Sequence, residues 1–213
     1  MLSMTMSLAD IREAGPCSQG WTKFLRHLGY EGGAYDPDRR VTLGDIAASN
    51  GAPDAWWCVR CLDLTNLMVR RRVVRALLPA CRRAAASTTD TRVAACLDAV
   101  DRWTESDDTI DLPAAAAGAY AAAYEARASG AYAAAYAADA ATYAANAAAD
   151  VYAEDAQESV VEAAANATNT AAADAAADVY AADAAAADAD AERRAQVADI
   201  VDEFGRWSPS PAA

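Results

Sequence analysis

The sequence has a single histidine, His27, and only two phenylalanines among its 213 residues. Histidine is the commonest general base and a frequent zinc ligand, so its near absence leaves little material for a conventional active site. The chain also lacks the motifs GxGxxG and GxSxG and the Walker A loop, which bind dinucleotides, carry a serine nucleophile and hold phosphates. We therefore expect no enzymatic activity and no cofactor.

Long runs of leucine, isoleucine, valine or phenylalanine are also missing, and the first ten residues do not combine a cationic start with an apolar stretch. A helix that spans a bilayer needs about 20 apolar residues, and a secretory signal needs both of those features. The five cysteines are an odd number without the spacing of a disulfide framework. These absences predict a soluble, cytoplasmic protein with reduced thiols and no membrane partner.

Charge is divided unevenly between the two halves of the chain. Residues 1–104 contain 14 Lys and Arg against 11 Asp and Glu, whereas residues 105–213 contain 4 against 20. The halves therefore carry about +3 and −16, which gives the net charge of −13. Because an acidic protein is repelled by nucleic-acid phosphates, generic nucleic-acid binding is disfavoured.

Composition divides the chain into four stretches. The first mixes glycine, proline and aromatic residues, which is typical of short helices joined by turns. The second shows the hydrophobic spacing of helices, the third is saturated with alanine, and the last contains two prolines. We predict an N-terminal module over residues 1–50 and an amphipathic helical core over 51–106. An alanine-rich helical region over 113–207 should pack on that core as one unit, and residues 208–213 should form a disordered tail.

The second stretch should supply most of the large core residues. Asp54 is suited to cap a helix over residues 55–68, and the next helix should be interrupted at Pro79. A third helix should begin near Asp90 and reach Trp103, because apolar residues recur there at helical spacing.

The alanine-rich stretch has the strongest helical signal. Residues 114–191 contain 43 alanines and one basic residue, Arg127, and alanine has the highest helix propensity. The run GAYAAAY occurs twice, from Gly118 and from Gly130. We expect two or three helices, broken near Gly130 and near residues 166–170, and set close together because alanine faces let helix axes approach. The predicted fold class is all-α: a bundle of conventional amphipathic helices packed against close-set alanine-rich helices.

The pair Cys58 and Cys61 has the spacing of a metal-binding or redox motif. Tetrahedral zinc needs two further ligands, and the sequence offers one histidine and no second CxxC. A redox pair usually begins a helix that follows a strand, and no strand is apparent here. We predict no metal and interpret both thiols as buried helical residues.

The densest positive patch is an arginine cluster formed by Arg70, Arg71, Arg72 and Arg75, with Arg82 and Arg83 further along. Two interpretations stay open. The cluster is either a solvated or internally ion-paired helix face, or an anion and nucleotide site in which guanidinium groups bind phosphates and an aromatic ring stacks on a base. The aromatic residues considered for that site are Trp56, Trp57, Tyr120 and Tyr124.

Acidic residues step by four along the alanine-rich stretch, at Asp150, Glu154, Glu158 and Glu162. In one continuous helix they would share a face, where repulsion between like charges costs a few tenths of a kcal/mol per pair. Such a face either keeps an alanine-rich helix in solution, or binds a basic partner or imitates the phosphates of DNA.

Several segments carry a family resemblance: Asp10–Arg12, Pro16–Trp21 with Phe24, Thr42–Leu43, Asn50–Gly51, Asp54–Trp56, Arg75–Pro79, Cys96–Trp103 and the Ala/Tyr/Asp tract. Together they resemble a bacterial and phage immunity-protein family, in which a short N-terminal module precedes an alanine-rich helical tail. This chain departs from it by an arginine-rich segment after Pro79 and a more acidic tail. The resemblance implies protection or counter-defence, but assigns no mechanism and no functional residue.

Three functional hypotheses follow from these features. The leading one is a non-enzymatic immunity-type protein, in bacterial self-protection or phage counter-defence, that binds a protein target stoichiometrically through its acidic helical surface. The second is a sponge that sequesters a small nucleotide-like immune signal in an arginine and aromatic pocket. The third is a structural protein whose alanine-rich helices form a homo-oligomer.

Overall fold

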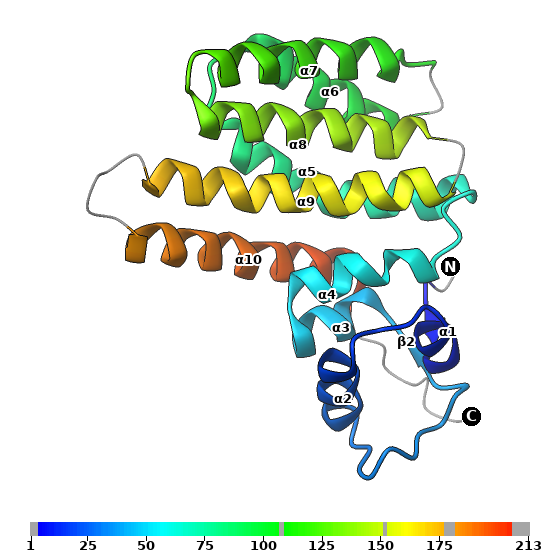
Figure 1. The fold of residues 1–213 in the computed structure, drawn as a ribbon. Coiled ribbons are helices and arrows are strands. Elements are labelled where there is room, and N and C mark those ends of the chain that lie inside the picture. The colour runs from blue at the N-terminus through cyan, green and yellow to red at the C-terminus, as the bar shows by residue number, and fades with distance from the viewer. Residues whose placement is uncertain (1–3, 107–108, 151–152, 177–181, 206–213) are drawn as a thin grey trace.

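The computed structural model describes residues 4–106, 109–150, 153–176 and 182–205. These residues form ten α-helices, one 3-10 helix and a single two-stranded sheet, so the protein is an all-α helical bundle as predicted. Figure 1 shows α7, α8, α9 and α10 side by side in one layer, with α5 and α6 behind them and the N-terminal elements at one end.

The N-terminal module contains short elements, which are β1 (Met6–Ser7), α1 (Leu8–Glu13), α2 (Ser18–His27), β2 (Arg40–Val41) and α3 (Leu43–Asn50). Strands β1 and β2 pair antiparallel, with Met6 opposite Val41, and both of these side chains are buried. Each strand has only two residues, which is why no strand was apparent in the sequence. Capping boxes begin α1 and α3, so each helix starts where a strand ends.

The helix predicted over residues 55–68 is wrong. The chain forms α4 (Ala52–Trp57) and then the 3-10 helix η1 (Cys58–Cys61), after which Leu62 is extended. The side chain of Asn66 accepts hydrogen bonds from the amides of Met68 and Val69 and begins a new helix, α5 (Leu67–Ala85). A local cap of this kind satisfies the amides that a continuous helix would have satisfied with its own carbonyls.

The predicted interruption at Pro79 is also wrong, because α5 continues through that residue. A proline inside a helix removes one backbone hydrogen bond and normally costs about 3 kcal/mol. Here the neighbouring Leu78 and Ala80 are buried, at 4% and 0% exposure, so packing of this turn against the bundle offsets the cost. Helix α6 (Thr91–Glu105) begins after Asp90, which caps it, and this prediction is confirmed.

Four helices follow in the described part of the alanine-rich region, where two or three were predicted: α7 (Leu112–Ala128), α8 (Tyr132–Ala149), α9 (Ala153–Ala176) and α10 (Ala182–Phe204). The break at Gly130 is confirmed, and this glycine has a positive φ of 79°. The break predicted near residues 166–170 is wrong. Asn166 and Thr170 each donate a side-chain hydrogen bond to a carbonyl one turn earlier in α9, so these polar residues stay within the helix. The predicted tail over 208–213 lies outside the described residues.

Alanine burial holds the layer together. Most of α8 is buried, because α7 and α9 flank it and α5 and α6 cover its back. The thiols of Cys81 on α5 and Cys96 on α6 donate to the carbonyls of Ala140 and Ala141 on α8, over 3.6 and 3.4 Å. Such side chain to backbone contacts require the close helix spacing that small residues permit. One hydrophobic cluster includes residues from all three predicted segments.

The end of α10 docks on the N-terminal module. Thr42 donates its hydroxyl to the carbonyl oxygen of Gly205 over 2.8 Å, and Ile200 and Phe204 are buried nearby in the same cluster. The contact is so close that a Cβ atom added to Gly44 would lie 2.0 Å from that carbonyl oxygen. A residue near the end of the chain therefore fixes α3, which carries part of the pocket described below.

Across the described ranges, no helix is both long enough and apolar enough to cross a membrane.

Candidate functional site

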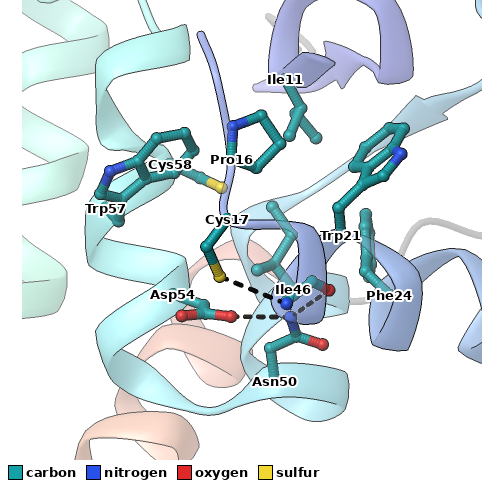
Figure 2. Close-up of a pocket in the computed structure, with 11 residues that line it drawn as sticks. Ile11, Pro16, Cys17, Trp21, Phe24, Ile46, Asn50, Asp54, Trp57 and Cys58 are labelled. Carbon is teal, nitrogen blue, oxygen red and sulfur yellow. Dashed lines mark hydrogen bonds between the residues drawn. The ribbon is translucent and has the colours of Figure 1, made fainter.

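A pocket of about 110 Å³ lies where α1, α2, α3 and α4 meet. Its apolar wall is formed by Ile11, Trp21, Phe24, Ile46 and Trp57. Figure 2 shows Trp57 on one side and Trp21 with Phe24 on the other. Trp21 is supported by Tyr35, whose ring meets it edge to face with the centroids 5.2 Å apart. The short helices therefore form a small aromatic cavity from segments far apart in the sequence.

The polar edge of the pocket is a fixed hydrogen-bond network. The side-chain amide of Asn50 donates to the carbonyl of Gly20 over 2.9 Å and to Oδ2 of Asp54 over 2.7 Å, and its oxygen accepts from Ser49 over 2.7 Å. Every hydrogen-bonding group of the amide is engaged, which sets its orientation. A Cβ atom on Gly20 would lie 2.8 Å from Oδ2 of Asp54, so this arrangement needs a glycine there.

Two cysteines also line the pocket, Cys17 and Cys58. Cys17 caps α2, and its sulfur accepts a hydrogen bond from the amide of Gly20 over 3.3 Å. Burial raises the pKa of Cys58 far above its ordinary value, and the neighbouring Cys61 and Asp54 raise it further. Cys61 lies outside the lining, and burial raises its pKa to about 11. Both thiols of the CxxC pair are therefore protonated at neutral pH, which opposes metal binding and nucleophilic attack.

Within the described ranges, no group of three or more His, Cys, Asp or Glu side chains is placed to hold a metal ion. The CxxC pair is in the 3-10 helix η1 and not in an α-helix, which corrects the sequence-based interpretation.

The arginine cluster lies on α5 and is largely engaged by the rest of the chain. Arg72 forms a 3.0 Å ion pair with Glu203 of α10, and its guanidinium lies 5.4 Å from the ring of Phe204. Arg75 donates to the backbone carbonyl of Thr104 over 2.9 Å, at the end of α6. These contacts favour the interpretation of the cluster as an internally paired helix face.

The other two members of the cluster surround Trp103. The guanidinium carbons of Arg70 and Arg71 lie 5.8 and 5.6 Å from its ring centroid, and Arg71 also donates to the carbonyl of Ser106 over 2.6 Å. Further along α5, Arg83 makes two hydrogen bonds to Glu192 and one to Asp199, both on α10. The basic face of α5 is thus joined to α6 and α10 by charge and by aromatic contact.

The aromatic residues expected beside this cluster are elsewhere. Trp56 is buried at 2% exposure and donates its indole N–H to Gln196 over 3.1 Å. Trp57 lines the small pocket, and Arg60 of η1 lies 4.3 Å from its ring centroid. Tyr120 and Tyr124 are 61% and 70% exposed on α7, at the far edge of the layer in Figure 1. The structure thus does not bring the residues of the predicted nucleotide site together.

Three of the four predicted acidic residues share an exposed face. Glu154, Glu158 and Glu162 project from α9 at intervals of four, and in the described part of the chain their carboxylates make no ion pair or hydrogen bond. We call these three residues the acidic face. Asp150 does not belong to it, because α8 ends at Ala149 and the four-residue spacing then crosses a helix boundary.

Asp150 has a different environment, at the end of α8. It accepts a hydrogen bond from Ser159 over 3.4 Å. Burial raises its pKa above the ordinary value, and the like charge of Asp155 raises it further, whereas the hydrogen bond from Ser159 and the charge of Arg70 oppose the shift. This carboxylate is therefore a partly buried helix terminus and not part of a continuous surface.

Sequence reasoning missed the buried polar contacts of α10. Gln196 is 2% exposed, and its amide nitrogen donates to Ala164, Thr168 and Glu192 while its oxygen accepts from Trp56. A signal was present, because position 196 lies at helical spacing with the apolar residues Ile200 and Phe204. A glutamine on such a stripe indicates a buried hydrogen-bonding role.

Comparisons of the chain with protein-family models, with curated proteins and with solved structures find no match. The resemblance to an immunity-protein family therefore stays a prediction. The function has to be inferred from the charge, burial and contacts of the residues described above.

Proposed function

We propose that this protein is a non-enzymatic, immunity-type binding protein that holds a basic protein target stoichiometrically through the acidic face of α9. One observation carries the proposal. The carboxylates of Glu154, Glu158 and Glu162 are exposed and have no partner among the described residues, whereas three carboxylates of α10 are paired with arginines of α5. These three unpaired carboxylates are therefore directed outward in a regular row on one helix.

The geometry of the acidic face suits a basic helix or an extended basic segment. Residues four apart in a helix are separated by about 6 Å along its axis, so the face presents a row of regularly spaced negative charges. With a net charge of −13, the whole chain attracts a basic partner from a distance, and the exposed row then sets its position.

The proposal of binding without catalysis is supported by the side chains of the pocket. The single histidine, His27, is exposed at the end of α2 and does not line the pocket. The thiol of Cys58 is held in its protonated form by burial. The proposal includes a reducing, cytoplasmic compartment, because all five cysteines are free. Self-protection or phage counter-defence is the biological role that the family resemblance suggests for such a binder.

The test compares two triple variants of the full chain with equal changes in charge. The first, Glu154→Gln with Glu158→Gln and Glu162→Gln, removes the acidic face. The control neutralises exposed acidic residues outside α9, namely Glu13, Glu31 and Glu105. Each protein is immobilised and exposed to a lysate from a host whose defence it blocks, and protection is scored in that host.

We expect the wild type and the control to retain one basic protein and to protect, and the acidic-face variant to bind that protein at least about tenfold more weakly. Raising the salt from about 0.1 M to about 1 M shortens the Debye length from about 10 to about 3 Å and should release the partner. Failure to recover a basic partner, or full protection by the acidic-face variant, would refute the proposal.

A second candidate function, self-association, is favoured by exposed aromatic residues on α7 and at the start of α8. Tyr120, Tyr124 and Tyr132 are each more than 60% exposed on α7 and α8, although side chains of this size are usually buried or at interfaces. If the protein is structural, light scattering will show a dimer or larger species that Tyr120→Ser with Tyr124→Ser dissociates. A monomer at all concentrations would exclude this candidate.

A further inference from the structure

We propose that the pocket between α1, α2, α3 and α4 binds an alkyl chain that ends in a guanidinium or ammonium group, the chemistry of an arginine or lysine side chain. This inference does not rest on the proposed function, because the pocket uses none of the residues of the acidic face. Its three supports are the apolar wall, one carboxylate without a positive partner, and aromatic rings that already attract guanidinium groups.

The apolar wall selects a compact hydrocarbon chain. The pocket holds about 110 Å³ and is open at its mouth, which is room for one side chain and not for a folded element. Most of the surface that a guest would contact is apolar, and its large side chains are Trp21, Phe24, Ile46 and Trp57. Burying three or four methylene groups against such a wall is favourable, because it removes apolar surface from water.

The carboxylate of Asp54 determines the charge of the guest. Among the described residues, Asp54 is the one acidic residue that lines the pocket, and no lysine or arginine of that part of the chain lines it. Its Oδ2 accepts from Asn50, whereas Oδ1 has no hydrogen bond to any residue that the structure describes. A carboxylate has about four acceptor sites, so Asp54 can still take one or two donors. A cationic donor forms the stronger, charge-assisted bond.

The aromatic rings of the pocket also favour a cationic guest. Arg12 lies 5.9 Å from the ring centroid of Trp21, and Arg60 lies 4.3 Å from that of Trp57. Both tryptophans of the pocket therefore already attract a guanidinium group of this chain. Neither arginine forms an ion pair with Asp54 in the described structure, so the carboxylate charge stays available to a guest.

The pocket is also organised before a guest arrives. The three hydrogen bonds of Asn50 fix the position of Oδ2, and the absence of a side chain at Gly20 leaves room for that carboxylate. Little conformational entropy is therefore lost when a guest binds, so that even a small guest can bind with measurable affinity.

The experiment uses the full chain and two probes of equal shape, n-butylguanidinium and its neutral analogue n-butylurea. Binding is followed by the fluorescence of the tryptophans and by calorimetry. We expect n-butylguanidinium to bind with a dissociation constant of about 1 mM, and about tenfold more tightly than n-butylurea. Asp54→Asn keeps the shape of the side chain and its acceptor for Asn50, and should reduce the ratio between the probes to about one.

Two controls separate this site from other effects. Glu13→Gln removes an exposed charge near the end of α1 and should leave the tenfold ratio intact. The triple variant of the acidic face should also leave it intact, so that failure of one proposal is distinguishable from failure of the other. Circular dichroism checks that Asp54→Asn remains folded, and Asp54→Glu provides a second variant that keeps the charge but displaces it.

The arms of the experiment also distinguish the source of the guest. A blocked peptide, N-acetyl-Gly-Arg-Gly amide, that binds at least as tightly as n-butylguanidinium indicates an arginine side chain of a protein partner. Binding of n-butylguanidinium without binding of the peptide indicates a free small amine or guanidine. Equal binding of the two small probes, no binding of either, or an unchanged ratio in Asp54→Asn would overturn the proposal.

Discussion

Two glycine to alanine substitutions should have opposite effects on stability, although both glycines are in helices. Gly44 is in α3, where a new Cβ atom would lie 2.0 Å from the carbonyl oxygen and 2.9 Å from the carbonyl carbon of Gly205. Gly118 is in α7, where the nearest atom to a new Cβ is the Cβ of Arg92 at 3.9 Å. The first contact is with backbone and cannot be relieved by a rotamer change, whereas the second is ordinary van der Waals contact.

The expected change in the free energy of unfolding follows from the contacts that the end of α10 makes with the N-terminal module. In Gly44→Ala the last turn must move away, which exposes part of Phe204 at a cost of about 2 kcal/mol and breaks the Thr42 to Gly205 hydrogen bond at a cost of about 1 kcal/mol. The helix propensity of alanine returns at most about 1 kcal/mol. We therefore expect a net loss of about 2 kcal/mol. Gly118→Ala should instead gain up to about 1 kcal/mol, because it changes propensity alone.

Urea unfolding followed by circular dichroism at constant temperature measures both effects. For a slope of about 2 kcal/mol per molar urea, the midpoint should fall by about 1 M in Gly44→Ala and rise by less than about 0.5 M in Gly118→Ala. A Gly44→Ala protein as stable as the wild type would refute the docking of α10 on α3. A loss of stability in Gly118→Ala would show that α7 packs more tightly on its neighbours than the structure indicates.

Three further predictions test local chemistry. The folded-state pKa of Asp10 is lowered, mainly because its carboxylate accepts a hydrogen bond from the backbone amide of Ser7. The charged carboxylate therefore stabilises the fold above its ordinary pKa, and this stabilisation is lost as the pH falls through the lowered pKa. In thermal unfolding, Asp10→Asn should be less stable than the wild type at pH 7 and equally stable below the lowered pKa. A thiol reagent at pH 8 should modify the exposed Cys17 first and leave Cys81 unmodified until the protein unfolds, because burial raises the pKa of Cys81 to about 12. Gln196→Leu should cost about 2 kcal/mol in urea unfolding, because it leaves the indole N–H of Trp56 buried without an acceptor.

The features predicted correctly from the sequence depend on local chemistry. A helix was expected to begin near Asp90 because apolar residues recur after it at helical spacing, and the structure shows that the Asp90 carboxylate caps the first turn of α6. Gly130 was expected to lie at a break because the run that it begins repeats an earlier one after 12 residues, an offset that does not return to the same helix face. The structure shows this glycine at positive φ, which glycine adopts without strain. The all-α class follows from alanine content and hydrophobic spacing, neither of which requires knowledge of distant contacts.

The errors arise where tertiary contacts outweigh local preference. Pro79 does not end α5, because burial of its neighbours compensates for the missing hydrogen bond. The polar run at residues 166–170 does not break α9, because its side chains bond to carbonyls of their own helix. The pocket could not be predicted at all, since Asn50, Asp54 and Trp21 come from different helices and meet only in the folded chain.

The carboxylates of the acidic half fall into two groups with different environments. Part of the acidic half neutralises the basic face of α5, since Glu192 and Asp199 of α10 bind Arg83, and Glu203 binds Arg72. Because these carboxylates are only 8–22% exposed, they cannot also present charge to a partner. The acidic face of α9 has the opposite property, since its exposed carboxylates contribute nothing to internal pairing among the described residues. The acidic face therefore has a cost in repulsion without an internal ion pair to offset it, and this supports the proposed binding of a basic partner.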